Sequence, residues 1–376
     1  MSFTRNASKS LRFISLLAIA SLAMTGCAGA SSTAGNQAPS ASPEPVMIAA
    51  PLTGVKYEEG SEQANALKSP AVTCKIDNSY DARPQQGLNQ TDTVFVEMVE
   101  GGLTRLVATW HSSKPEAVGP VRSIRPMDPD IISPYGGIVC YSGGQLAFVK
   151  LMQQTQVFNA SETSEQGKGT FSRTKERIAP HNVIVNVSKL AANHPELAAP
   201  QNMFDFAASA QKASAATSAS SPDVTSFAVS YPSALSEWTW SPTTVSANGD
   251  AGVWVRNQDK EKHTDSLTGE QIRATNVIVM QVQIDRSYAD HKYGHIPKSV
   301  LVSSGKATVF SGGRMIEGTW QKSSQTSRII FTDASGAAIE IAPGNTWIEL
   351  MPNAPEGKLT IKSTPRVASP SATPNK

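Results

Sequence analysis

Apolar and polar residues alternate differently in two long stretches of the chain. Between residues 51 and 206, apolar runs such as AVTCKI, TVFVEMV, TRLVATW and GIVCYS are typical of buried strands. Amphipathic segments such as QLAFVKLMQQ and VSKLAANHPEL, typical of helices, lie among them. Strands mixed with helices predict an α/β domain with a mixed sheet, and the EGGL between two of the runs predicts a hairpin.

Residues 223–362 have a different pattern. Alternating runs such as ATNVIVMQVQI and SRIIFTDASGAAIEIA are separated by Gly-Lys, Gly-Gly and Ser-Gly turns. This pattern predicts a mostly antiparallel, β-rich C-terminal domain.

Two segments of low complexity border this second region. Residues 207–222 are rich in Ala and Ser, and we interpret them as a linker between the domains, although their alanines could also form a short helix. Residues 363–376 have the composition of a disordered tail.

The N-terminus has the pattern of a targeting signal. Arg5, Lys9 and Arg12 precede a short apolar run, Phe13 to Ala23, which is followed by MTGC. The last motif resembles the bacterial lipobox, so we predict a signal peptide at residues 1–26 and lipidation of Cys27 by acyl chains such as palmitate. Residues 27–50 would then be a disordered tether, and the protein would be anchored by lipid to the extracytoplasmic face of the cell membrane.

The charge of the mature chain bears on its partners. Removing residues 1–26 takes away three positive and no negative charges, so the formal net charge falls from +2 to −1. A nucleic-acid-binding protein normally has a basic excess, and we therefore expect no nucleic-acid partner. We also expect no metal and no cofactor.

Cys74 and Cys140 are the other cysteines, and both lie in apolar runs. Because neighbouring residues in a sheet rarely have the geometry that a disulfide needs, we expect two buried thiols.

The candidate chemistry centres on arginines in turns. GPVRSIRP contains Arg122 and Arg125, and EMVEGGLTR contains Glu97, Glu100 and Arg105. A guanidinium binds carboxylate or phosphate through a planar fork, so these loops could form an anion pocket. Alternatively, the two glutamates pair with the arginines and fix the loops, which is the more common arrangement.

A histidine segment adds a second kind of candidate. His181 and Asn182 lie in IAPHN, before a strand, and Asp77 and Asn78 end the run AVTCKIDN. His181 with Glu97 or Glu100 could serve as acid and base. A loop histidine that bonds the backbone, and a turn stabilised by Asp77 or Asn78, are the structural alternatives.

The order of the motifs resembles the YerB-like family of bacterial envelope lipoproteins, whose activity is not established. The resemblance rests on APLTG, IDNSYDARPQQGL, EMVEGGLTRL, GPVRSIRP, YSGG with Ser142 and Gly143, RIAPHN, and GNTWIELMP. It implies a lipoprotein with an α/β and a β-rich domain. Where the family often has His before the small-Gly-Gly step, this chain has Tyr141, which with an ordinary pKa of about 10 is a poor base near neutrality.

We expect GPVRSIRP, VEGGLTR, YSGG and PHN to meet near the strand ends at one edge of the α/β domain, where ligands tend to bind. The favoured hypothesis is a non-enzymatic binding or assembly factor that recognises an anionic wall polymer or an envelope protein. The alternatives are a hydrolase or transferase acting on cell-wall polymer and a purely structural lipoprotein.

Overall fold

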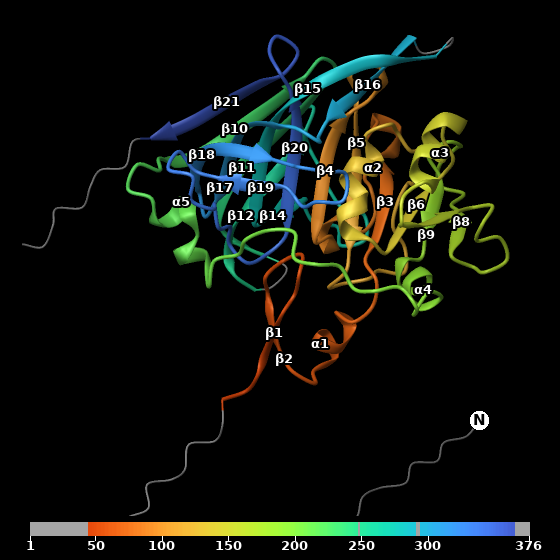
Figure 1. Ribbon diagram of the computed structural model, residues 1–376, viewed down its shortest axis with the longest axis horizontal. Coiled ribbons are helices and arrows are strands. Elements are labelled where there is room, and N and C mark those ends of the chain that lie inside the picture. The colour runs from red at the N-terminus through yellow and green to blue at the C-terminus, as the bar shows by residue number, and fades with distance from the viewer. Residues whose placement is uncertain (1–43, 247–248, 291–293, 365–376) are drawn as a thin grey trace, which may run out of the picture. The chain divides into compact units, whose positions relative to one another are not determined.

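Strands dominate the structure, a computed structural model that describes residues 44–246, 249–290 and 294–364 (Figure 1). The predicted signal peptide, Cys27, most of the tether and nearly all of the predicted tail lie outside the described residues. The strands before residue 200 are β1 (Met47–Ala49), β2 (Lys56–Glu58), β3 (Val72–Asp77), β4 (Thr93–Met98), β5 (Thr104–Trp110), β6 (Ile138–Tyr141), β7 (Phe158–Ser161), β8 (Phe171–Arg173) and β9 (Val183–Val185).

The helices of this part are short. They are α1 (Glu62–Ala66), α2 (Asp128–Ile132), α3 (Leu146–Gln153) and α4 (Val187–Ala192), with 3-10 helices η1 (Tyr80–Ala82), η2 (Leu88–Gln90), η3 (Glu100–Gly102) and η4 (Ser133–Tyr135). The predicted helices after YSGG and HNVIVN are confirmed as α3 and α4, and the EGGL hairpin joins antiparallel β4 and β5.

The C-terminal part is almost entirely β. It consists of η5 (Ala210–Lys212), α5 (Ser214–Thr217), β10 (Asp223–Tyr231), β11 (Ala234–Val245), β12 (Ala251–Gln258), β13 (Glu261–Lys262), β14 (Arg273–Ala274), β15 (Asn276–Asp290), β16 (Gly294–Val300), β17 (Ser304–Ser311), β18 (Arg314–Gln321), β19 (Ile330–Thr332), β20 (Thr346–Pro352) and β21 (Lys358–Thr364). Its pairings are antiparallel except where β20 lies parallel to β15, so the expectation of a mostly antiparallel region is confirmed.

One sheet runs through both parts of the chain. Its central strands follow the order β7, β6, β3, β5, β4, β20, β15, β17, β18 and β19. The two parts meet where β4 pairs in parallel with β20, with Thr93 opposite Thr346 and Val96 opposite Glu349. The predicted β-rich region therefore continues the sheet of the first region, and the described residues from Pro45 onward form one compact unit.

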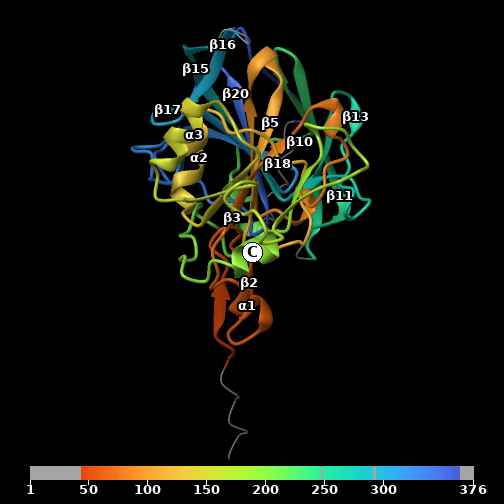
Figure 2. The same cartoon turned by 90° about the vertical axis from the view of Figure 1, so that its right-hand side faces the viewer.

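The central sheet is covered on both faces. Ile76 and Leu106 point to one face, where they share a core with Phe227 of β10, Trp238 of β11 and Leu190 of α4. On the opposite face, residues such as Phe95, Val107 and Val139 pack against α2 and α3. Figure 2 shows α2 and α3 on one side of the sheet, and β11 and β13 on the other. Because both faces are covered, the strands are continuous apolar runs.

Three predicted segment boundaries are wrong. The predicted tether reaches into β1, where Met47–Ala49 pair with β2. The predicted linker, residues 207–222, contains η5 and α5, and its Ala213 and Ala215 are buried. The small side chain of alanine suits this close packing. Composition alone cannot distinguish such a packed segment from a linker, because both are rich in Ala and Ser. Strand β21 continues to Thr364, two residues into the predicted tail.

The expectation for the cysteines is also wrong. Cys74 and Cys140 lie opposite each other on the parallel strands β3 and β6, and they form a disulfide. Both residues are fully buried. With no free thiol at Cys140, this position cannot act as a nucleophile.

Candidate functional site

The site forms where β3 and β6 separate. They pair in parallel as far as Cys74 and Cys140, and the segment 119–122 then lies between them. The N–H of Arg122 donates to Lys75 O at 2.8 Å, and the N–H of Ser142 donates to Arg122 O at 3.0 Å. The separation of two parallel strands at their carboxyl ends creates the kind of crevice in which ligands bind to α/β sheets.

An open cleft of about 780 Å³ lies at these strand ends. It brings together the three arginines and two of the carboxylates that the sequence suggested. The lining consists of Asp77, Ser79, Val99, Glu100, Gly101, Leu103, Thr104, Arg105, Arg122, Ser123, Arg125, Gly144, Gln145 and Pro180. The expected meeting of the GPVRSIRP, VEGGLTR, YSGG and PHN segments is thus confirmed.

Two of the arginines form ion pairs within the cleft. Arg125 Nε donates to Glu100 Oε2 at 2.9 Å. Arg122 Nε lies 3.0 Å from Asp77 Oδ2, although this contact is not aligned as a hydrogen bond. Carboxylates thus pair with arginines and fix the loops, which was the alternative to an anion pocket. Each pair, however, uses only part of the guanidinium group.

Several guanidinium nitrogens have no partner among the described residues. Arg105 is 8% exposed, and only its Nη1 donates a hydrogen bond, to Ser123 O at 3.0 Å. Arg125 uses Nε and Nη1 but not Nη2, and neither terminal nitrogen of Arg122 donates to a described residue. Because these nitrogens are not buried and their residues line the open cleft, they can donate to water or to an anion there.

The electrostatics of the cleft follow from burial and from the crowded charges. Burial and the positive charges of Arg125 and Arg122 lower the pKa of Arg105 to about 10. Burial alone would raise the pKa of Asp77, but the Ser79 N–H, the charge of Arg122 and the bond with His181 outweigh it, so the pKa is lowered. Asp77 is therefore a carboxylate near neutral pH.

His181 contacts a different carboxylate from those expected. Its Nδ1 lies 2.7 Å from Asp77 Oδ2 and 3.3 Å from Ser79 Oγ, and its side chain is 21% exposed. A relay of the Ser-His-Asp kind needs the serine and the carboxylate on opposite ring nitrogens. Here both contact Nδ1, so these three residues do not form such a relay.

Glu97 lies outside the cleft lining, in a buried charge cluster. The ammonium of Lys75 contacts Glu97 Oε1 and lies 2.7 Å from Asp128 Oδ1, and all three side chains are fully buried. Burial and the charge of Asp128 raise the pKa of Glu97 to about 8. Glu97 is on the same face of the sheet as Arg105, but it faces α2, whose first residue is Asp128.

The remaining residues predicted for the site make hydrogen bonds to other parts of the fold. Asn78 donates to Thr104 Oγ1 at 2.8 Å and to Gln258 Oε1 at 3.1 Å, which ties the site to β12. Ser142 and Gly143 bond the arginine loop through their backbones, and Asn182 accepts from Arg173 at 2.9 Å. They are outside the lining of the cleft.

Gln145 is a lining residue that the predicted segments do not include. It directly follows the predicted YSGG and lines the cleft together with Gly144 at the start of α3, where no side chain caps the helix. The double glycine followed by an amphipathic run is the sequence feature that indicates Gly144 and Gln145 as lining residues, because such a turn exposes the first backbone amides of the helix. Tyr141 is buried, and burial raises the pKa of its hydroxyl, so it is no base.

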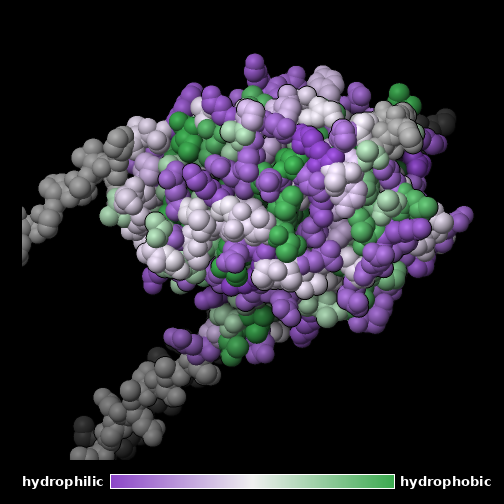
Figure 3. Space-filling model, turned by 45° about the horizontal axis from the view of Figure 1, so that its top comes forward, coloured by the Kyte–Doolittle hydropathy of each residue, from purple (hydrophilic) through white to green (hydrophobic). Residues whose placement is uncertain are grey.

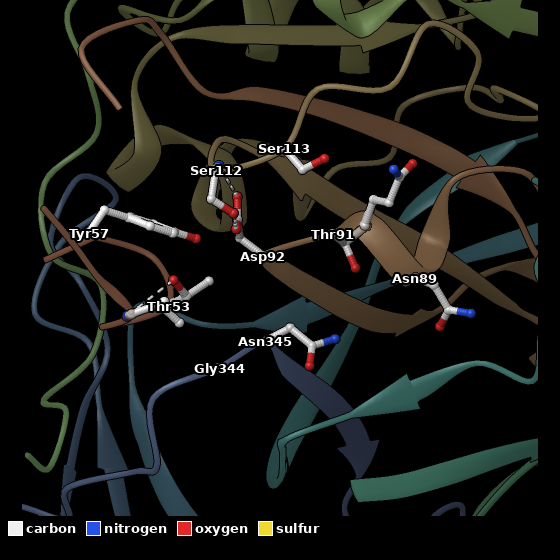
Figure 4. A pocket seen from close by; sticks show the side chains of 11 residues that line it. Thr53, Tyr57, Asn89, Thr91, Asp92, Ser112, Ser113, Gly344 and Asn345 are labelled. Atoms are coloured by element: carbon white, nitrogen blue, oxygen red, sulfur yellow. Dashed lines mark hydrogen bonds between the residues drawn. The ribbon is translucent and has the colours of Figure 1, made fainter. Parts of the chain in front are cut away.

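A smaller cavity of about 250 Å³ lies elsewhere (Figure 4). Hydroxyl and amide side chains such as those of Tyr57 and Asn345 line it, together with the carboxyl group of Asp92. The carboxylate of Asp92 accepts from Ser112 and from the N–H of His111, so its oxygens are used within the fold. Burial raises the pKa of Asp92. No arginine lines this cavity, and the larger cleft is the better candidate.

Among the described residues, no group of three or more His, Cys, Asp and Glu is placed to hold a metal ion. None of the described helices has the length and apolar character that a bilayer span requires.

Comparison with known proteins gives consistent matches over most of the chain. Residues 52–200 match the family model "Protein of unknown function (DUF3048) N-terminal domain", and residues 227–348 match its C-terminal counterpart. A Bacillus subtilis protein named "Putative lipoprotein YerB" is 27% identical over 309 residues, covering 81% of this chain and 87% of its own. The crystal structure of YerB from that organism superposes with a TM-score of 0.68 at 22% identity, over 83% of this chain and 99% of that one.

Proposed function

Because the chain belongs to the YerB-like DUF3048 family, we propose that it is a lipid-anchored extracytoplasmic lipoprotein that binds an anionic component of the cell wall. The relative's name and the lipobox-like MTGC support the anchor on Cys27. The observation that carries the binding role is the cleft itself, where Arg105, Arg122 and Arg125 keep nitrogens that donate to none of the described residues.

The position of the cleft supports a ligand beyond the membrane surface. Val72, at the start of β3, lies at the same end of the sheet as α1, and Asp77, at the cleft, ends the strand. Six residues of strand span about 20 Å. Figures 1 and 2 both show β1, β2 and α1 at one end of the sheet. The cleft opens at the opposite end from the arm through which the N-terminal segment enters the fold.

Thermal unfolding of residues 28–376 tests the proposal, with peptidoglycan fragments, teichoic-acid fragments or inorganic phosphate added. A ligand at about 100 times its dissociation constant stabilises a protein by about 2.7 kcal/mol. We expect stabilisation of the wild type by a wall fragment, its loss in Arg122→Ala and partial retention in Arg122→Lys. Absence of any shift with all three ligand classes contradicts the proposal.

One observation favours an enzyme as the second candidate. The contact of His181 with Asp77 orients an imidazole beside the cleft, as a hydrolase or transferase of wall polymer would need. In place of Glu97 or Glu100, Asp77 would then be the partner. His181→Gln distinguishes the two functions: an enzyme loses turnover of wall polymer, whereas a binding protein keeps its ligand-induced stabilisation.

A further inference from the structure

Exposed hydrophobic residues occur in the segments that form the charged cleft. In the described chain, ten large hydrophobic residues are exposed, and four of them belong to the loops of the site. Leu103 lines the cleft and is 46% exposed. The other three lie within two residues of a lining residue: Tyr80 (72% exposed), Leu146 (69%) and Ile178 (85%). We call these four residues the apolar rim.

The loops that carry the apolar rim are tied together. Ser79, next to Tyr80, contacts the ring of His181, and the N–H of His181 donates to Ile178 O at 2.9 Å. Leu146 is the first residue of α3, beside the lining residue Gln145. Figure 3 shows hydrophobic and polar residues interspersed on the face that it presents. Exposed apolar residues beside a cleft lined by arginines suit a ligand with an anionic end and an apolar neighbour.

The charge of the cleft indicates which anion it takes. Three arginines and two carboxylates line it, which leaves one formal positive charge. One carboxylate neutralises this charge, and its planar shape matches the guanidinium fork, whereas a phosphate monoester carries nearly two negative charges near neutrality.

The exposure of the apolar rim indicates what kind of apolar group the ligand carries. Of the residues of the apolar rim, Leu103 lines the open cleft, and the other three are exposed on neighbouring positions of the chain, so the apolar contact surface in the cleft is small and suits small side chains better than a long acyl chain. A cleft of about 780 Å³ is large enough for a short peptide.

Resting on the proposed function, we infer that the cleft binds the free carboxyl end of a short peptide with small aliphatic side chains. The carboxylate bonds the free nitrogens of Arg105 and Arg122. The aliphatic side chains lie on Leu103 and the rest of the apolar rim.

Calorimetric titration of residues 28–376 with acetyl-Ala-Ala-Ala tests this inference, with the C-terminal amide of the same peptide and n-butyl phosphate as comparisons. We expect the amide to bind at least about tenfold more weakly, because it forfeits charge-assisted hydrogen bonds. Arg122→Ala should weaken binding of the acid about tenfold, and Leu103→Ser about threefold to fivefold. The control is Ile330→Ser on β19, an exposed residue outside the cleft, which should leave binding unchanged.

If the peptide acid binds, three results of the comparison still overturn the inference. The acid and the amide bind equally, or Leu103→Ser binds like Ile330→Ser, or n-butyl phosphate binds more tightly than the peptide acid. If wall fragments stabilise the wild type but the peptide acid does not bind, the proposed function stands and the inference fails. If neither a wall fragment nor the peptide binds, both fail. Thermal unfolding of each variant separates lost binding from lost folding.

Discussion

At the scale of single residues, Glu97 makes the stability of the protein depend on pH. Its pKa is raised from 4.5 to about 8 by burial and by Asp128, so the folded state keeps a proton that the unfolded state releases. Between these two values the free energy of unfolding falls as pH rises, by up to about 1.4 kcal/mol per pH unit. Below pH 4.5 and above pH 8 this residue contributes no slope.

We predict that Glu97→Gln removes this slope, because an amide cannot ionise and Lys75 keeps Asp128 as a partner. Urea unfolding of both proteins at several pH values from 4.5 to 8.5 measures it. The matched control is Glu100→Gln. Burial raises the pKa of Glu100, but Arg125 outweighs it and the pKa is lowered, so this variant should keep the slope of the wild type in that range. Equal slopes in the wild type and Glu97→Gln would contradict the prediction.

At the scale of elements, the disulfide holds β3 to β6 at the point where the two strands separate. It joins residues 66 positions apart, and a cross-link over a loop of this length stabilises a protein by roughly 4 kcal/mol. We predict that Cys74→Ala with Cys140→Ala lowers the free energy of unfolding by about that amount, as measured by urea unfolding.

The reductant provides the control for the disulfide. Dithiothreitol should destabilise the wild type under partly denaturing conditions and leave the double variant unchanged. Because the segment 119–122 lies between the same two strands, any binding of wall fragments should weaken in the double variant as well. A double variant as stable as the wild type would show that strand pairing alone holds this edge.

At the scale of the whole molecule, the pairing of β4 with β20 makes the two parts of the chain interdependent. Tyr231 Oη and Trp238 Nε1 donate to the buried carboxylate of Glu349 on β20, at 2.9 and 3.0 Å. The same core includes β3, β4 and β5. Separating the parts would expose an apolar strand edge and this core.

We therefore predict that residues 45–206 do not fold alone. Circular dichroism during heating should show no cooperative transition for this fragment, whereas residues 45–364 should unfold in one step. Co-expression of residues 45–206 with residues 207–364 is the control for a damaged fragment, and the two should purify together. A cooperative transition of the fragment at the temperature of the intact chain would contradict the prediction.

The sequence by itself determined the apolar strands β3, β4, β5, β6 and β9, the helices after YSGG and HNVIVN, and the loops that carry Arg105, Arg122 and Arg125. Burial imposes a local period on each element, and glycines and prolines mark the turns between them. The sequence also predicted that the segments of the site meet, because the ends of neighbouring strands lie at one edge of a sheet.

Only the tertiary structure decided which groups are paired. Lys75 contacts Glu97 and Asp128, which are 22 and 53 residues away in the sequence, so Glu97 lies in this buried cluster and not in the cleft. The carboxylate that contacts His181 is therefore Asp77. The disulfide and the β4–β20 pairing were likewise missed. All of them depend on the order of strands in the sheet, which contacts between distant residues set, and local periodicity is the same for any strand order.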